Sequence, residues 1–167
     1  MSHATKTTHP KEMMKVLGVD DIQKAFFAHI GLYLTDPEKA HMLEFSAVGS
    51  PRVHKTLLLE TTGRDSGKAR LAPLVYLEYG DTYTLIGTNA GATTHPHWAK
   101  NLMANPHCHI RVASRQFDAV ARVVEGDERE NLYAMWEQAF EPIAQYKYKT
   151  AGRVIPVFVL DDLTPTN

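Results

Sequence analysis

Residues 56–79 read TLLLETTGRDSGKARLAPLVYLEY, and this stretch decides how the chain folds. Residues 56–62 have a short apolar centre with β-branched flanks, which predicts a strand that Gly63 ends. A second strand is predicted from Leu71 to Tyr79. Because the turn between them contains two glycines, Gly63 and Gly67, the two strands are expected to pair as an antiparallel hairpin.

More hairpins are predicted further along the chain. Gly80-Asp81 indicates a turn into the next strand. A turn at Ser114-Arg115 separates two stretches in which apolar and polar residues alternate, which indicates a hairpin with one buried face. Pro156 is expected at an edge or a bulge, because proline cannot donate a ladder hydrogen bond. The strands predicted in this part of the chain cover residues 82–87, 110–112, 117–123 and 154–160.

Three helices are predicted before and between these strands. The first begins near Asp20 and carries apolar residues at helical spacing as far as Leu34. Thr94 is expected to cap a short second helix, with Pro96 in its first turn. A third helix opens at Gly126. The residues expected to face inward are Trp98, Leu102 and Met103 on the second helix, and Leu132, Met135, Trp136, Ala139 and Phe140 on the third.

The whole pattern predicts an α+β protein, in which mostly antiparallel strands form a small β-barrel with flanking helices. A length of 167 residues favours one domain. We expect residues 1–18 to be a flexible N-terminal tail and residues 19–167 to be a single barrel domain.

The composition excludes several classes of function. The chain has 18 basic and 19 acidic residues, a balance that argues against a nucleic-acid partner and against a polybasic membrane binder. The lone Cys108 excludes an intramolecular disulfide. No apolar run approaches the ~20 residues of a spanning helix, and the first residues lack the apolar stretch of a secretion signal, so a cytoplasmic location is expected.

The densest polar motif is the hairpin turn of residues 62–70. Glycines allow backbone N–H groups to converge, and arginine guanidinium groups bind phosphate or carboxylate with two hydrogen bonds. Arg64 and Arg70 stand on opposite arms of the hairpin and are expected to hold an anionic ligand between them. The alternative is an ordinary solvated turn, since charged turns with glycine are common.

A second motif, residues 87–98, ends a strand in a loop of small residues that leads into a helix N-terminus. Such a junction offers unpaired N–H groups to an anion or to a planar heteroaromatic ring. Trp98 is positioned to pack on such a ring. The alternative is a helix-capping loop in which Trp98 is a core anchor.

Other polar residues carry weaker signals. His95-x-His97 and His107-x-His109 have a spacing that metal sites use, but no carboxylate stands at ligand spacing beside them, so we expect no metal site. The Asp161-Asp162 pair is interpreted as a solvated tail. A nucleophilic serine is not expected, because the Gly-x-Ser-x-Gly motif is missing.

Four segments of the chain carry a recognisable combination of residues. With x for any residue, they read LLLETTGRxSGxxRxxPL at 57–74, HPxWxxNLxxNP at 95–106, ARVV at 121–124 and IPV at 155–157. Together they resemble the deazaflavin-dependent nitroreductase and quinone reductase family, in its order and spacing, over residues 50–162.

The resemblance implies a split β-barrel that binds coenzyme F-420, an 8-hydroxy-5-deazaflavin with a phosphate and a polyglutamate tail. In such a barrel Arg64, Ser66 and Arg70 would hold the phosphate and the tail. Residues 71–75 would line the hairpin arm, and residues 87–89 would approach the deazaflavin ring. Asp65 stands where many relatives carry lysine. The implied cofactor-binding residues are Arg64, Asp65, Ser66, Arg70, Leu71, Ala72, Pro73, Leu74, Val75, Gly87, Thr88, Asn89, His97, Trp98, Lys100 and Asn101.

The implied reaction is hydride transfer from the reduced deazaflavin to a small-molecule electron acceptor: a quinone, a nitro compound or an activated enone. Thr88 and Tyr146 are the expected proton donors or substrate contacts. Phe140 and Ile143 stand where the nitroreductase branch has substrate-side tyrosines, and Tyr146 retains the tyrosine, so these three are the expected substrate residues.

Several alternatives stay open at the level of sequence. One is an oxidoreductase that uses FMN in the same split barrel, and another is a barrel that binds a small molecule without catalysis. The N-terminal helix, with Phe26 and Phe27, is expected to pack on the barrel, the alternatives being that it covers the pocket or makes peripheral contact with a membrane. Both a monomer and a homodimer are compatible with this fold.

Overall fold

The computed structural model describes residues 19–45 and 50–166. The tail predicted over residues 1–18 lies outside these ranges. In chain order the elements are α2 (Val19–Thr35), α3 (Pro37–Ala40), β1 (Met42–Glu44), β2 (Val53–Thr62), β3 (Ala69–Val75), β4 (Leu77–Tyr79), β5 (Thr82–Ile86), the 3-10 helix η2 (Asn89–Gly91), α4 (His97–Ala104), β6 (His107–Val112), β7 (Arg115–Val123), α5 (Gly126–Ala139), α6 (Ile143–Tyr146) and β8 (Val157–Thr166).

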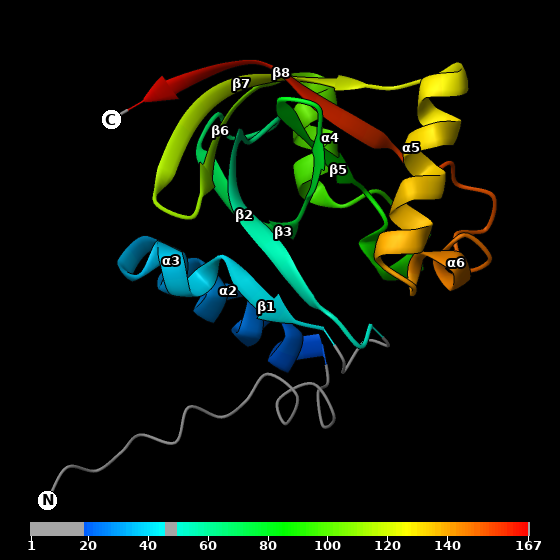
Figure 1. Ribbon diagram of the computed structural model, residues 1–167, viewed down its shortest axis with the longest axis horizontal. Coiled ribbons are helices and arrows are strands. Elements are labelled where there is room, and N and C mark those ends of the chain that lie inside the picture. The colour runs from blue at the N-terminus through cyan, green and yellow to red at the C-terminus, as the bar shows by residue number, and fades with distance from the viewer. Residues whose placement is uncertain (1–18, 46–49, 167) are drawn as a thin grey trace, which may run out of the picture.

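The strands form one antiparallel sheet that curls into a split barrel (Figure 1). Their order is β1-β2-β6-β7-β8-β5-β4, and β3 pairs with β2 off this path. Because β3 and β4 are consecutive, with β3 on β2 and β4 on β5, the chain passes directly from the β2 side of the sheet to its β4 end. The α+β split-barrel fold predicted from the sequence is confirmed.

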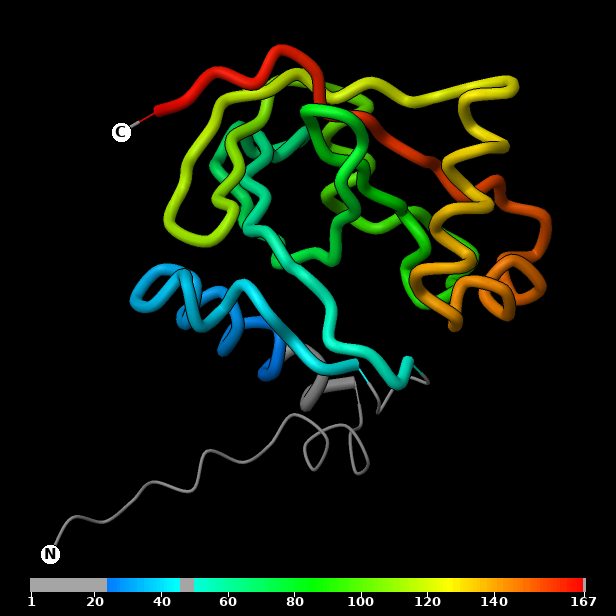
Figure 2. The backbone as a smooth tube through the Cα atoms, in the orientation of Figure 1, coloured from blue at the N-terminus to red at the C-terminus, as the bar shows by residue number. Residues whose placement is uncertain are grey.

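The strand predicted from Leu71 to Tyr79 is interrupted at Tyr76. Its backbone N–H donates to the carbonyl of Lys55 (3.3 Å), and its ring is buried in the barrel. The tube that follows β2 crosses here from one side of the barrel to the other before it continues into β5 (Figure 2). A break is therefore needed here, because one straight strand could not pair with both β2 and β5.

The barrel interior and the two sets of helices bury the apolar residues of the sheet. Leu57 and Leu59 on β2 point inward among Leu85, Ile110 and Phe158. Alternation along the strand turns Leu58 to the opposite face. There it packs under α2, while α5 and α6 cover another side of the barrel (Figure 1).

The N-terminal helix α2 packs on the barrel, as expected. The Tyr33 hydroxyl donates to the carbonyl of Thr56 (2.5 Å) and accepts from the N–H of Ala113 (3.2 Å). Phe26 and Phe27 lie on the exposed side of the helix, with Phe27 at 67% exposure. Within residues 19–45 and 50–166, no helix combines the length and the apolar character needed to cross a bilayer.

Two details of the second predicted helix are wrong. The α4 helix begins at His97 with Pro96 at its N-cap and no side-chain cap, so Thr94 does not cap it. Met103 is exposed, and Ala99 and Asn101 are buried with Leu102 instead. The helix thus starts later than predicted, and its buried face includes the polar Asn101, which bonds to Thr61 and Arg64, a contact that an apolar pattern does not indicate.

The C-terminal strand also differs from its prediction. β8 begins after Pro156 and runs to Thr166, so the proline precedes the ladder rather than interrupting it. Asp161 lies within this strand and not in a solvated tail. Its carboxylate accepts from Arg122 Nε on β7 (2.7 Å), a partner 39 residues away that no local pattern could indicate.

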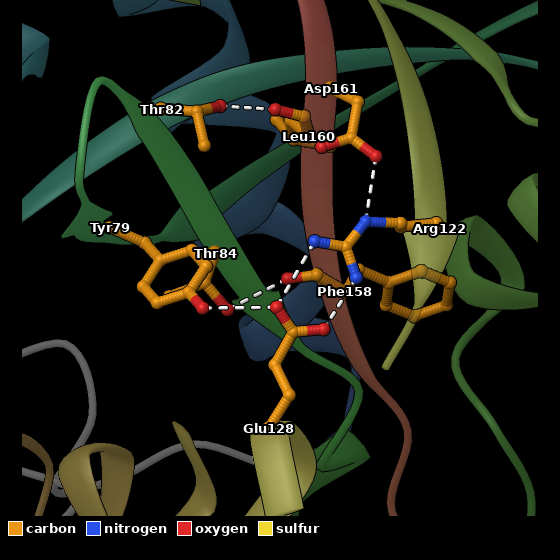
Figure 3. Close-up of polar contacts among 8 residues, drawn as sticks. All are labelled: Tyr79, Thr82, Thr84, Arg122, Glu128, Phe158, Leu160 and Asp161. Atoms are coloured by element: carbon orange, nitrogen blue, oxygen red, sulfur yellow. Dashed lines mark hydrogen bonds and ion pairs between the residues drawn. The ribbon is translucent and has the colours of Figure 1, made fainter. Parts of the chain in front are cut away.

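Arg122 connects the sheet to the first turn of α5 (Figure 3). Its two terminal nitrogens donate to the two oxygens of Glu128 at 2.5 and 3.1 Å. The Tyr79 hydroxyl donates to the same carboxylate (3.0 Å), and these hydrogen bonds lower the pKa of Glu128. The helix that leads to α6 is therefore anchored to β4, β7 and β8.

Histidines beside α2 are expected to make the stability depend on pH. His29 Nε2 donates to the carbonyl of Ala40 (2.9 Å), and His41 Nε2 lies 2.8 Å from the Tyr76 hydroxyl. Burial lowers the pKa of both histidines. The unfolded chain therefore takes up protons first, and stability falls as pH drops below about 6.5 toward the lowered folded values.

Urea unfolding at pH values between about 7.5 and about 5.5 tests this expectation. The free energy of unfolding should decrease toward the acidic end, and the decrease should shrink in a His29→Gln/His41→Gln double variant. His107→Gln, at an exposed histidine, is the matched control. Stability that stays level or rises on acidification would refute the expectation, because the lowered carboxylate pKa values act only below about 4.5.

Candidate functional site

The hairpin turn between β2 and β3 is closed by its own backbone. Gly63 N–H donates to the carbonyl of Lys68 (2.7 Å), and Gly67 N–H donates to the carbonyl of Gly63 (2.8 Å). A Cβ on Gly63 would stand 2.7 Å from Ser66 Oγ and 3.2 Å from the Lys68 carbonyl. Only glycine fits at this position, so the turn has a defined shape before any ligand binds.

Arg64 fastens this turn to α4. Its backbone N–H and its Nη1 both donate to Asn101 Oδ1, at 3.2 and 2.9 Å. Asn101 is only 3% exposed, and its amide nitrogen donates to Thr61 Oγ1 on β2 (3.1 Å). Arg64 Nη2 also lies 3.2 Å from His97 Nδ1, which must accept because a guanidinium only donates. The structure thus brings three predicted residues, Arg64, His97 and Asn101, into one group.

The turn carries positive charge that the described part of the chain does not neutralise. Within that part, Arg64, Lys68 and Arg70 make no ion pair with a carboxylate, whereas Arg122 pairs with both Glu128 and Asp161. The Arg70 guanidinium instead donates to Ser66 Oγ (3.4 Å). Three exposed cations on a rigid turn have the chemistry to bind an anion with phosphate or carboxylate groups.

The small-residue loop of residues 87–95 follows β5 and includes η2. Gly87 N–H donates to the carbonyl of Pro156 (2.8 Å), and a Cβ on Gly87 would stand 2.8 Å from the Pro156 ring. Asn89, Ala90 and Gly91 all have left-handed backbone, with φ of 48, 52 and 78°. A run of left-handed residues is costly for alanine, and it persists only where the surroundings hold it.

Arg153 provides that hold, and sequence reasoning missed it. Its guanidinium donates to the carbonyls of Gly87, Thr88 and Ala92, which lie 61 to 66 residues earlier in the chain. No motif contains Arg153, and a separation of this size leaves no periodic signal. Only the three-dimensional fold identifies it as part of the site.

The predicted residues of α4 divide between the surface and the core. His97 is exposed and Lys100 is half-buried. Trp98 is also half-buried, with its ring centroid 5.5 Å from that of Phe158 on β8. One side of Trp98 therefore anchors the helix to the barrel core.

The predicted residues of β3 lie on two faces, because side chains alternate along a strand. Leu71 packs toward α2 and Val75 toward α5 and α6, whereas Leu74 packs on the barrel core and the buried Ala72 shares its face by alternation. The five residues 71–75 consequently cannot all contact one ligand.

The three predicted substrate residues lie close together, at the end of α5 and on α6, but their surroundings differ. Tyr146 on α6 lies beside the loop, since a Cβ on Gly91 would meet its backbone at 3.1 Å. Phe140 packs against His54, with ring centroids 5.0 Å apart, and Ile143 is fully buried in the core under α5. Burial raises the pKa of Tyr146, so its hydroxyl stays protonated at neutral pH.

A buried polar cluster joins β2 to the segment between α5 and α6. Ser50 Oγ lies 2.6 Å from His54 Nε2 and donates to Glu141 Oε2 (3.1 Å), and Glu141 pairs with Arg52 (2.9 Å). Burial lowers the pKa of His54. Ser50 and His54 are buried, whereas Arg52 and Glu141 are partly exposed, so the cluster ties the start of β2 to the surface between α5 and α6.

The second histidine pair lies on an outer face of the sheet. His109 is within hydrogen-bond distance of Asp118 (2.9 Å) and Gln116 (3.0 Å). Both predicted histidines border an open depression of about 300 Å³, together with Glu60 and Asp118. Among residues 19–45 and 50–166, no group of three or more side chains is arranged to hold a metal ion.

A family model, a curated relative and a solved structure point to the same family. The F-420H(2)-dependent quinone reductase family matches residues 38–162. An F-420H(2)-dependent quinone reductase of Mycobacterium tuberculosis is 34% identical over 115 residues, which are 66% of this chain and 75% of that protein. A solved structure described as an F-420-H2 dependent reductase is 36% identical, with a TM-score of 0.58, and the match covers 64% of this chain and 93% of that one. Another, described as a domain-swapped dimer, has the same identity and TM-score and covers 64% of this chain and 79% of that one.

Proposed function

Because the chain belongs to the F-420H(2)-dependent quinone reductase family, we propose that it transfers a hydride from reduced coenzyme F-420 to a quinone. The observation that carries this proposal is the hairpin turn, where Arg64, Lys68 and Arg70 have no described carboxylate partner. A cofactor with a phosphate and a polyglutamate tail needs such a turn.

The residues present fit the two chemically different ends of this cofactor. At the anionic end, Arg64, Ser66 and Arg70 would hold the phosphate and the tail, with His97 and Asn101 keeping Arg64 in place. Lys100 adds a further positive charge on α4. At the other end, the loop of residues 87–89 would receive the flat ring, with Gly87 packed against Pro156 and Asn89 exposed.

The chain's own part in the reaction is to orient the reactants and to supply a proton. Reduced coenzyme F-420, when bound, supplies the hydride. Tyr146 is the residue we assign to protonation of the acceptor, because burial raises its pKa and keeps the phenol in its acid form. Its hydroxyl has no hydrogen-bond partner within the described ranges, which leaves the proton available to a ligand. Thr88, whose carbonyl is held by Arg153, is the other residue to which we assign this role.

Replacement of Tyr146 by phenylalanine tests this assignment. The ring and its packing are kept and only the hydroxyl is lost, so kcat with a quinone should fall about 100-fold or more. The dissociation constant for coenzyme F-420 should stay within about twofold of the unmodified protein, because no cofactor contact is assigned to the hydroxyl. Thr88→Val is the companion variant. If Tyr146→Phe turns over at the original rate, the proton comes from elsewhere.

The function itself is tested by following the oxidation of reduced coenzyme F-420 with a panel of acceptors. We expect turnover with simple quinones, and the same assay determines whether nitroaromatics and activated enones also react. Binding of the cofactor without turnover of any acceptor would identify the protein as a non-catalytic binding barrel. Purification as a yellow protein with the two-banded visible spectrum of FMN would point to a flavin-dependent relative instead.

A further inference from the structure

The Arg153 guanidinium contacts the loop of residues 87–95 at four places. Nη1 donates to the Gly87 carbonyl (3.0 Å), Nη2 to the Thr88 carbonyl (2.7 Å) and Nε to the Ala92 carbonyl (3.0 Å). Nη1 also lies 2.9 Å from His95 Nδ1. A single side chain thus satisfies carbonyls on both sides of the left-handed segment.

These contacts also determine the direction in which two backbone N–H groups of the loop point, because the peptide bond is planar. In a trans peptide the C=O of one residue and the N–H of the next point in opposite directions. Because the carbonyls of Gly87 and Thr88 point at Arg153, the N–H groups of Thr88 and Asn89 point away from it. Within residues 19–45 and 50–166, neither N–H donates a hydrogen bond. Two consecutive amide donors are therefore free on the far side of the loop.

The position of Arg153 is fixed independently of the loop. Its backbone N–H donates to the carbonyl of Thr150 (3.1 Å), closing a turn in which Ala151 and Gly152 have φ of 52 and 85°. Thr150 is buried, and its hydroxyl donates to the carbonyl of Lys147 (3.2 Å). Arg153 therefore extends from an ordered turn, and the loop takes its shape from this side chain.

The contact with His95 fixes the state of that imidazole as well. A guanidinium has no acceptor, so His95 Nδ1 must carry a lone pair toward Arg153. The proton of the neutral ring is then on Nε2, where it forms a further donor at the end of the loop. Burial and the charge of Arg153 lower the pKa of His95, which favours this neutral form.

We propose that Arg153 is a positioning residue of the cofactor site, which turns the N–H groups of Thr88 and Asn89 toward the carbonyl oxygens of the bound deazaflavin ring. This inference rests on the proposed function, since it is the cofactor ring that receives the two donors. Lysine cannot replace Arg153 in this role. Its ammonium group is compact, whereas the guanidinium reaches three separate carbonyls from one rigid plane.

The test compares Arg153→Lys with Arg129→Lys. Arg129 is a suitable control, because it also donates to a main-chain carbonyl in the same region, that of Ile155 (2.8 Å), but makes no contact with the loop. In a fluorescence titration with coenzyme F-420, Arg153→Lys should raise the dissociation constant about 10- to 100-fold, as expected when charge-assisted hydrogen bonds are lost. Arg129→Lys should leave it within about twofold.

A second measurement follows the loop in the absence of cofactor. Nitrogen NMR of the His95 ring should show an unprotonated Nδ1 and a protonated Nε2 in the unmodified protein, and a changed tautomer distribution in Arg153→Lys. Identical His95 spectra for the two proteins, or equal affinities for coenzyme F-420, would overturn the inference. If the unmodified protein fails to bind coenzyme F-420, both the proposed function and the proposed role of the two amide groups are wrong. The His95 spectra still test separately whether Arg153 orders the loop.

Discussion

Replacing Arg64 with alanine should weaken binding of coenzyme F-420 about 100-fold, as expected for the loss of a two-pronged charged donor. The side chain is already ordered by Asn101 and His97, so the unmodified protein loses little conformational entropy when the anion binds. The Arg64 backbone N–H still reaches Asn101 in the variant, which should preserve the turn. Arg64→Lys keeps the positive charge but loses the paired N–H donors of the guanidinium. Its affinity for coenzyme F-420 should lie between those of the unmodified protein and Arg64→Ala.

The measurement is a fluorescence titration of each variant at several salt concentrations. The unmodified protein should lose affinity as salt rises, and Arg64→Ala should show a shallower salt dependence because one cation is gone. Arg52→Ala is the matched control, since it also removes one exposed arginine from the same β2 region, but one that pairs with Glu141. An Arg64→Ala protein that binds within about twofold of the unmodified protein would show that the hairpin does not hold the cofactor.

Replacing Trp136 with alanine should destabilise the fold by about 3 to 5 kcal/mol. Trp136 is 1% exposed and packs under α5 among Val124, Val157, Val159 and Ile143. Its indole N–H also donates to Thr84 Oγ1 on β5 (3.4 Å). The removal of such a ring leaves a cavity that the rigid sheet on one side cannot collapse to fill.

Urea unfolding measures this effect. Trp136→Phe should lose less than Trp136→Ala, because most of the ring volume is kept. Tyr148→Ala is the control, with 82% exposure and an expected change within about 0.5 kcal/mol. A loss below about 1 kcal/mol for Trp136→Ala would mean that α5 is not held by its core contacts. Because α5 leads into α6, loosening α5 should also displace Tyr146 on α6 and lower the activity.

The parts of the fold that could be predicted are those with local signals. The hairpin of β6 and β7 was predicted from alternation and turn chemistry, which are short-range, although β6 begins three residues and β7 two residues before the predicted strands. The long helix α5 was predicted for the same reason, from its apolar spacing. The break at Tyr76 could not be predicted, because it is caused by pairing with two distant strands, β2 and β5. Asp161 was misplaced for a similar reason, as its partner Arg122 lies on another strand.

In the candidate site, too, the features with local sequence signals could be predicted and those that join distant residues could not. Cations and glycines concentrated in nine residues made the hairpin turn visible in the sequence. The link from Arg64 through Asn101 to Thr61 was not visible, because it joins residues 37 and 40 positions apart. The placement of Ile143 in the core shows the limit of a motif: it identifies a position along the chain but not the direction of its side chain.

A side-by-side titration of the unmodified protein with coenzyme F-420, FMN and haem tests the central claim most directly. The proposed site predicts saturable binding of coenzyme F-420 that weakens as salt rises, with neither FMN nor haem binding at the same concentrations. A tighter complex with FMN or haem, or no detectable complex with coenzyme F-420 at high micromolar concentration, would contradict the account.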